Sequence, residues 1–285
     1  MAAVAVVTDS AACVPPDLVC RYDIHIVPFR LVLDGRVMQD GVEVRPPEFH
    51  RWLRSSSQPP STSQPPVGQF VDVYRQLARQ GKDIISIHIP REISGTVDAA
   101  RLAASMVPEA SIAVIDSRTA TIAEGFVALA AARAAHAGAS LGEVVAAAER
   151  AIANVDLFAC VPLATVASLQ RTGRSGQAEA LLEAPLNITP VLRLQNGRVA
   201  IAGVARNRQR GIAKMLTLVR RKAGNNLVRL ATFHASDQEE ANKVAERLLP
   251  SLRATEFYIT ELTPVMAVHT GPGVIGVALE VVDKE

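Results

Sequence analysis

Polar side chains able to bind an anion or to move a proton occur at three places in the first half of the sequence: Thr8-Asp9-Ser10, Ser94 and Asp116-Ser117. Each group lies shortly after a hydrophobic run. Ser94 also lies where a helical pattern opens, so its hydroxyl could cap that helix. Alternatively, the free N–H groups and the positive dipole end of the helix could bind the anionic group of a ligand. The sequence leaves both interpretations open.

A serine hydrolase is the enzyme class that such residues could form. Ser94 would be the nucleophile and His269 the base, and a third, orienting acid would be needed, for which Asp9 and Asp116 are conceivable. The residues around Ser94 do not match the nucleophile elbow G-x-S-x-G. An acyl hydrolase is therefore an alternative only, and we assign no catalytic residue.

The sequence gives no reason to expect a metal or a nucleotide cofactor. The histidines are scattered and the three cysteines form no C-x-x-C pair, which excludes the usual zinc spacings and a disulfide framework. The segment Gly271–Gly276 matches G-x-G-x-x-G, but the residues after it read as a strand instead of the helix that a dinucleotide fingerprint requires. No Walker A sequence occurs, so direct ATP binding is not indicated either.

The elements that must position these polar groups read as alternating strands and helices. Ala3–Val7, Ile84–Ile89 and Ile112–Ile115 are buried-strand patterns separated by helical segments, which predicts βαβ units and a parallel sheet. The polar groups would then lie at the carboxyl edge of that sheet, where open α/β sheets bind ligands. Residues 55–66 are rich in serine and proline, and we expect them to form a surface loop or linker.

The second half of the sequence contains an antiparallel element. Asn187–Leu194 and Arg198–Val204 flank Asn196-Gly197, which is a strong hairpin signal. Further strands and helices alternate up to the end of the chain, whose 285 residues agree with about two domains. We therefore predict an α/β protein of two domains, with a parallel sheet in residues 1–155 and a mixed sheet in residues 156–285.

Composition limits the class of protein further. Hydrophobic residues make up 49% of the chain and aromatic residues only 4%, so the core must be built from Val, Ile, Leu and Ala. The formal net charge of +2 excludes a uniformly basic protein. No stretch approaches the roughly 18 apolar residues of a membrane span, and the first residues lack the basic start of a signal peptide. We expect a cytoplasmic protein with no transmembrane segment.

Charge is unevenly distributed along the chain, because residues 184–236 contain no Asp or Glu. A basic window of this kind suits an anionic partner, either an acidic protein surface or phosphate groups. A nucleic-acid-binding regulator acting through residues 193–229 is the alternative, although the window has no interleaved aromatics and matches no known binding motif. The basic residues of the window are Arg193, Arg198, Arg206, Arg208, Arg210, Lys214, Arg220, Arg221, Lys222 and Arg229.

Seven short motifs, in this order and spread over the whole chain, resemble those of the DegV family of bacterial fatty-acid-binding proteins. Each motif is weak alone, and the ordered combination is specific. The motifs are Thr8-Asp9-Ser10, Thr62-Ser63-Gln64-Pro65, Ser94-Gly95-Thr96, Asp116-Ser117, Leu169 to Arg174 with its terminal Gly-Arg, Leu186 to Pro190, and His269-Thr270-Gly271-Pro272-Gly273.

The resemblance implies a carrier, not an enzyme, whose two α/β domains hold one long-chain fatty acid in a tunnel between them. It also implies a separate fatty-acid kinase that phosphorylates the bound carboxylate. By their motif positions, the residues that would bind the ligand are Thr62, Ser94, Gly95 through its amide, Thr96, His269 and, as a helper, Arg174. Arg206 falls where the family places basic residues for the kinase, and the neighbouring Arg208 and Arg210 would share this role.

Overall fold

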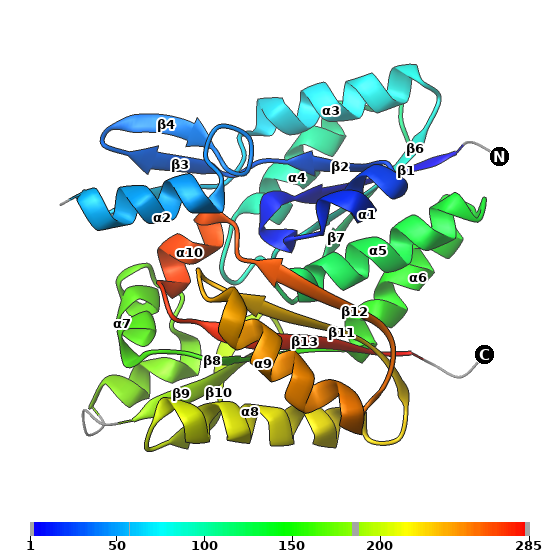
Figure 1. Ribbon diagram of the computed structural model, residues 1–285. Helices are drawn as coiled ribbons and strands as arrows, with labels where there is room; N and C mark the ends of the chain where they lie inside the picture. Colours follow the sequence, from blue (N-terminus) through cyan, green and yellow to red (C-terminus); the bar gives the residue numbers. More distant parts are fainter. Residues whose placement is uncertain (1–2, 57, 184–187, 283–285) are drawn as a thin grey trace. The chain divides into compact units, whose positions relative to one another are not determined.

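The structure is a computed structural model that describes residues 3–56, 58–183 and 188–282 (Figure 1). The chain divides into two compact units. Unit 1 comprises Met1–Ala153 together with Thr263–Val265, and unit 2 comprises Asn154–Leu262 together with Met266–Glu285. A short piece of chain near the C-terminus therefore returns to unit 1. None of the helices within the described ranges has the length and apolar character that crossing a membrane requires.

The main sheet of unit 1 is parallel throughout, as the sequence predicted. Its strand order is β2-β1-β6-β7, formed by β1 (Val4–Asp9), β2 (Ile24–Val27), β6 (Asp83–His88) and β7 (Ile112–Asp116). Because all four strands run the same way, their carboxyl ends share one edge. The polar groups that follow β1, β6 and β7 start from this edge, as expected.

Helices cover both faces of this sheet (Figure 1). Alternate side chains of β1, such as Ala5 and Val7, pack against α3 and α4, whereas α5 contacts β1 and β6 from the other side. The helix α5 is rich in alanine and almost completely buried, so a core with few aromatics is closed by small side chains at short range. The helices of unit 1 are α1 (Pro16–Arg21), α2 (Pro46–Ser55), α3 (Val67–Arg79), α4 (Thr96–Ser105), α5 (Ile122–His136) and α6 (Leu141–Asn154).

A second, antiparallel sheet in unit 1 corrects one expectation. Residues 55–66 do not form a loop throughout, because β5 (Ser61–Ser63) pairs with β3 (Arg30–Leu33), which in turn pairs with β4 (Arg36–Gln39). Thr62 lies opposite Leu31 in this pairing. The partner strand β3 lies in a different part of the chain, so the local composition of residues 55–66 could not reveal the pairing.

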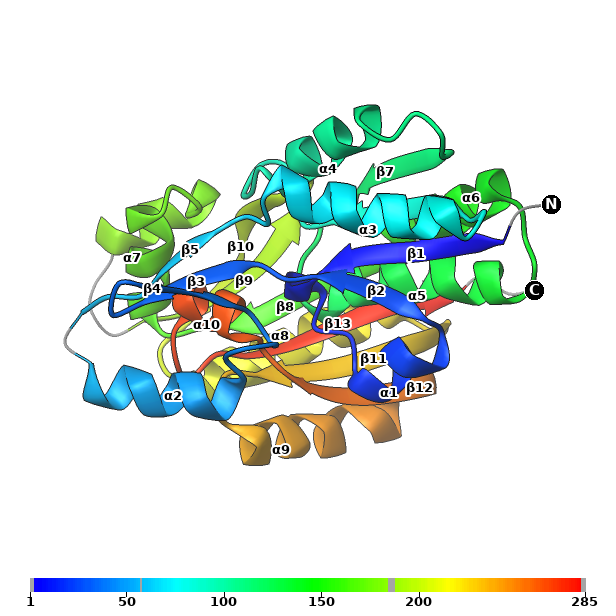
Figure 2. The ribbon, with the colours of Figure 1, turned by 90° about the horizontal axis from the view of Figure 1, so that it is seen from above.

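Unit 2 contains the predicted mixed sheet, with strand order β10-β9-β8-β13-β11-β12. Only β11 and β12 pair in parallel, and the other neighbours are antiparallel. Helices α8 and α9 bury their apolar faces against one side of the sheet, α9 along β11 and β12 (Figure 2). The strands are β8 (Val155–Cys160), β9 (Thr189–Gln195), β10 (Arg198–Ala205), β11 (Leu227–His234), β12 (Arg253–Glu261) and β13 (Ile275–Val282), and the helices are α7 (Leu163–Arg171), α8 (Arg208–Ala223), α9 (Gln238–Leu248) and α10 (Pro264–Thr270), whose first two residues belong to unit 1.

The β9–β10 hairpin confirms the prediction made from Asn196-Gly197. Both residues have positive φ, 50° and 77°, which is the conformation of a type I′ turn and matches the twist of the flanking strands. The start predicted for the first of these strands, Asn187, lies outside the described residues, as does part of the motif Leu186 to Pro190.

Candidate ligand-binding site

The Ser94-Gly95-Thr96 motif forms the start of α4. The helix begins at Thr96 with Gly95 as its N-cap residue, so Ser94 precedes the cap by one position. Its hydroxyl nevertheless accepts a hydrogen bond from the Thr96 N–H at 3.4 Å and lies 2.8 Å from Thr96 Oγ1. Thr96 is fully buried and Ser94 is half-buried. The buried threonine thus orients the hydroxyl of the more accessible serine.

The segment that carries Thr62 reaches the same helix start. A methyl group added at Gly95 would overlap Oε1 of the Gln64 side-chain amide. Thr62 is two residues before Gln64, at the middle of β5, and is half-buried. Within unit 1 the structure therefore brings together two of the segments that the sequence selected, far apart along the chain.

In unit 2, the positive charge of Arg174 affects the titration of His269. Burial lowers the pKa of the His269 imidazole to about 4, and the positive charge of Arg174 contributes to the same shift. Burial also lowers the pKa of the Arg174 guanidinium, which stays charged at any physiological pH. At neutral pH this pair is therefore a cation beside a neutral imidazole, an arrangement suited to holding a carboxylate.

The dipeptide Gly173-Arg174 lies just after the end of α7, where the backbone conformation requires a glycine. Gly173 has a φ of 69°, its N–H bonds to the Gln170 carbonyl at 2.9 Å, and the Arg174 N–H bonds to the Leu169 carbonyl at 2.8 Å. These two bonds define a Schellman motif, which ends a helix with a glycine in the left-handed conformation. Gly173 therefore fixes the direction in which Arg174 leaves the helix.

The loop after His269 is held by groups within unit 2. The Thr165 hydroxyl donates to the Thr270 carbonyl, and the Arg208 guanidinium donates to the Gly273 carbonyl. A second nitrogen of Arg208 bonds to the Asp237 carboxylate at 3.3 Å. Arg208, which we predicted to contact a partner, is thus engaged within its own unit, whereas Arg206 and Arg210 are exposed.

The basic window is less free than its sequence suggests. Arg193 and Lys222 both lie within 4 Å of the buried Asp156 carboxylate, at 3.9 and 3.7 Å, and Arg229 pairs with Glu256 and Glu280 at 3.0 and 2.9 Å. All three acids lie outside the window in sequence. Over the part of the chain that the structure describes, the basic residues of the window that are exposed and form neither an ion pair nor a hydrogen bond through their side chains are Arg198, Arg206, Arg210 and Arg221.

Both acids considered for a hydrolase already accept other hydrogen bonds. Asp9 accepts from the His88 ring and from the Ile89 N–H, both at 3.1 Å, and Asp116 accepts from the N–H groups of Arg91 and Arg118 at 3.2 and 2.8 Å. These contacts weaken the acyl-hydrolase alternative, because each carboxylate accepts hydrogen bonds from groups other than His269, the proposed base.

A Ser-His-Asp chain does exist, at a place that sequence reasoning missed. Ser86 Oγ lies 2.7 Å from His88 Nε2, and His88 Nδ1 lies 3.1 Å from Asp9 Oδ2. All three side chains are buried to within 1% of complete, and the Ser86 hydroxyl also accepts from Tyr74 at 2.7 Å. With no route for a substrate to Ser86, the chain serves as an internal hydrogen-bond network of unit 1.

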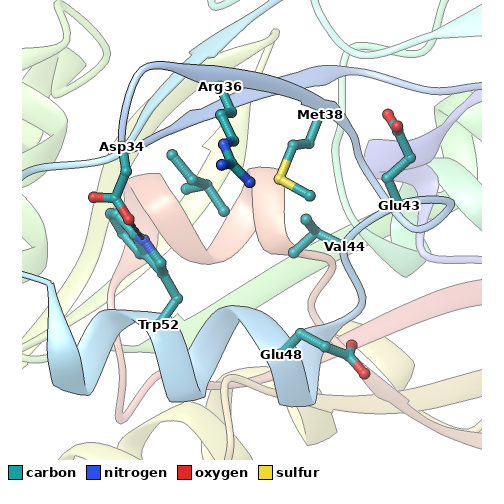
Figure 3. Close-up of a pocket in the computed structure, with 8 residues that line it drawn as sticks. Asp34, Arg36, Met38, Glu43, Val44, Glu48 and Trp52 are labelled. Carbon is teal, nitrogen blue, oxygen red and sulfur yellow. Dashed lines mark hydrogen bonds between the residues drawn. The ribbon is translucent and has the colours of Figure 1, made fainter.

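Unit 1 also has an open pocket of about 490 Å³ between the β3–β4 hairpin and α2 (Figure 3). Trp52 forms one side of the pocket, and its ring nitrogen donates to Asp34 at 2.6 Å. None of the predicted site residues lines it. No group of three His, Cys, Asp or Glu side chains able to hold a metal occurs among residues 3–56, 58–183 and 188–282. The pocket is lined by Leu33, Asp34, Arg36, Met38, Glu43, Val44, Glu48 and Trp52.

The part of the chain that matches known proteins contains all seven motifs found in the sequence. Residues 3–281 match the model of a family described as uncharacterised proteins of the DegV family. The chain belongs to the DegV family. A DegV domain-containing protein of Streptomyces coelicolor is 35% identical over 280 residues, which are 97% of this chain and 98% of that one. The resemblance seen in the sequence is thereby confirmed.

Two solved DegV structures share the fold over nearly the whole chain. A DegV family protein of Thermus thermophilus, described by its fatty acid binding, has a TM-score of 0.92 and 34% identity, covering 98% of this chain and 99% of that one. DegV of Bacillus subtilis, described as a fatty acid binding protein, has a TM-score of 0.91 and 30% identity, covering 99% and 100%. The predicted fold class is therefore confirmed, while the roles of the individual site residues stay predictions.

Proposed function

We propose that this protein binds a long-chain fatty acid and presents its carboxylate to a separate fatty-acid kinase, which forms the acyl phosphate. The observation that carries the proposal is the whole-chain similarity to fatty acid binding members of the DegV family. The kinase supplies the ATP chemistry, so the carrier itself needs no catalytic residue. In agreement with this division, the chain has no Walker A sequence.

The proposed carboxylate ligands are Thr62, Ser94 and the Gly95 amide from unit 1 and Arg174 and His269 from unit 2. A buried carboxylate is strongly penalised unless donors compensate it. Hydroxyls, a backbone N–H at a helix start, a neutral imidazole and a guanidinium are the donors that such a group needs. Burial and, as a smaller contribution, the charge of Arg174 lower the pKa of His269, so its imidazole stays neutral at neutral pH.

The acyl chain would supply most of the affinity. Each buried CH₂ contributes roughly 0.8 kcal/mol, so a 16-carbon chain could gain on the order of 12 kcal/mol before the losses of binding. A chain in which 49% of the residues are hydrophobic and only 4% are aromatic can provide aliphatic walls for such contact. The predicted tunnel between the two domains stays a prediction.

Mass spectrometry of the purified and denatured protein tests the binding proposal directly. We expect a fatty acid to be released in up to one equivalent per chain, because such a ligand dissociates slowly from a mostly apolar site. The native protein, stripped of lipid, should then take up added palmitate. A chain that is isolated without ligand and also fails to bind palmitate would contradict the proposed function.

The kinase partnership predicts a separable effect at Arg206. This exposed residue directly precedes Asn207, the N-cap of α8, and together with Arg210 it places positive charge at one end of that helix. Arg206→Glu is expected to lower the rate of acyl-phosphate formation by a purified fatty-acid kinase about tenfold or more, because rim charges govern association. Palmitate affinity should stay within twofold of the wild type.

Arg221→Glu is the matched control, since it reverses an exposed charge in the last turn of the same helix. Equal losses of turnover in both variants would show a general charge effect without a defined docking site. Loss of palmitate binding in the Arg206→Glu variant would instead indicate misfolding or a direct role in ligand binding.

A further inference from the structure

The short helix that carries His269 begins with residues that belong to unit 1. Helix α10 begins at Pro264, and the N–H of Val265, in its first turn, donates to the Asp40 carboxylate at 3.0 Å. The first N–H groups of a helix have no partner within the helix, and an acid that accepts from them acts as a cap. Asp40 is 225 positions away along the chain, so α10 is capped by a residue from a distant segment.

The segment before α10 is fixed at the same place. The Thr263 hydroxyl donates to the Ser10 carbonyl at 3.3 Å, and Thr263 precedes the helix by one residue. Ser10 and Asp40 are themselves joined through Phe29, whose N–H donates to Ser10 Oγ at 3.1 Å and whose carbonyl accepts from the Asp40 N–H at 2.9 Å. Two connected segments of unit 1, the 3-10 turn at Ser10 and the residue after β4, Asp40, thus bond to Thr263 and Val265.

The Thr8-Asp9-Ser10 motif acquires a role through these contacts. Asp9 accepts from the Ala11 N–H at 2.9 Å and shapes the short 3-10 turn Ser10–Ala12, and this turn presents the Ser10 carbonyl to Thr263. Asp9, Ser10 and Asp40 are all buried. The motif therefore builds the surface on which the start of α10 rests, and nothing in this arrangement requires contact with a ligand.

Asp40 is a costly residue to keep at this position. Burial is the main cause that raises the pKa of its carboxyl to about 6, and it outweighs the Ser10 hydroxyl, the Val265 N–H and the Thr263 hydroxyl, which lower it; the nearby Asp9 raises it a little further. An apolar residue would avoid this burial cost but could not accept from the first turn of α10. Asp40 therefore provides a carboxylate oxygen that accepts from the Val265 N–H, and the burial of this charged group lowers the folding stability of the protein.

We propose that Asp40 is a positioning residue that caps α10 and thereby holds His269 in the place required to bind the ligand carboxylate. His269 follows Val265 by four residues, or about one helical turn, so a shift at the first turn is transmitted along one rigid element. The inference rests on the proposed function, since it assigns to His269 the carboxylate of a fatty acid.

A double-mutant cycle with palmitate as the probe tests this role. Asp40→Ala removes the acceptor and is expected to weaken palmitate binding about tenfold, whereas Asp40→Asn keeps an oxygen at the same place and should lose less than threefold. In a His269→Gln background, Asp40→Ala should cost less than twofold, because the residue through which it acts is gone. Equal costs of Asp40→Ala in the two backgrounds would overturn the proposal.

Two further measurements keep the outcomes separable. If Asp40→Ala does not fold, Thr263→Val loosens the same anchor by removing the bond to Ser10 and should show the same dependence on His269. An NMR titration of His269 needs no ligand: its pKa should move from about 4 towards the ordinary range in Asp40→Ala. An unchanged titration overturns the positioning role, while a wild type that binds no palmitate contradicts only the proposed function.

Discussion

Palmitate is expected to bind about 100-fold more weakly when Thr62→Ala and Ser94→Ala are combined. The double variant removes two hydroxyl donors from the proposed carboxylate site, and a hydrogen bond to a charged acceptor contributes about 1.5–3 kcal/mol. Two such bonds at the lower end of this range contribute roughly 3 kcal/mol together, which corresponds to a factor of somewhat more than 100 in the dissociation constant. Titration calorimetry or displacement of a fluorescent fatty acid measures it, with circular dichroism to verify the fold.

Ser105→Ala combined with Thr217→Ala is the matched control. It removes the same two kinds of hydroxyl from exposed positions, one at the end of α4 and one on α8, where each bonds only to a carbonyl of its own helix. We expect palmitate affinity within twofold of the wild type for this control. If the Thr62 and Ser94 double variant behaves in the same way, neither residue belongs to the carboxylate site.

Gly276→Ala is expected to destabilise unit 2 by about 3 kcal/mol, the upper end of the range for overpacking a core. Gly276 in β13 lies directly opposite Phe233 in β11, and an added methyl group would overlap the ring of that phenylalanine. Phe233 is itself only 2% exposed, so the ring has nowhere to move. Denaturant or thermal unfolding followed by circular dichroism should show a lower midpoint.

Gly142→Ala makes the same chemical change where there is room. Gly142 lies near the start of α6, is exposed, and has no other group within 4 Å of an added methyl. In a helix, alanine is favoured over glycine by about 0.5–1 kcal/mol, so this variant should be equal to the wild type or slightly more stable. Equal midpoints for the two variants would show that Phe233 can repack at little cost.

The elements that the sequence predicted are those specified by local patterns. Buried strands such as Ala3–Val7 and the Asn196-Gly197 turn depend on residues next to one another, and both are found. The strand β5 was missed because Thr62 needs Leu31 as its partner. Serine and proline within one segment indicate a loop unless the distant strand is known.

The pairing of charges likewise depends on residues that are distant in the sequence. The acid-free window was visible in the sequence, but the pairing of three of its basic residues was not. Only the folded sheet brings Asp156, Glu256 and Glu280 to Arg193, Lys222 and Arg229. For the candidate site, the motif positions selected Arg174 and His269, and the structure adds their electrostatic interaction. Asp40 could not be found in this way, because no motif includes it and its role exists only through Val265.

The position of Trp52 decides how this protein should be observed during unfolding. It is the only tryptophan in the chain, it lies at the side of the pocket between the β3–β4 hairpin and α2 (Figure 3), and a hydrogen bond ties its indole to Asp34. Intrinsic fluorescence is therefore a built-in local probe of one corner of unit 1. Unfolding of the six-stranded sheet should register in circular dichroism and calorimetry while the emission spectrum reports on that corner alone.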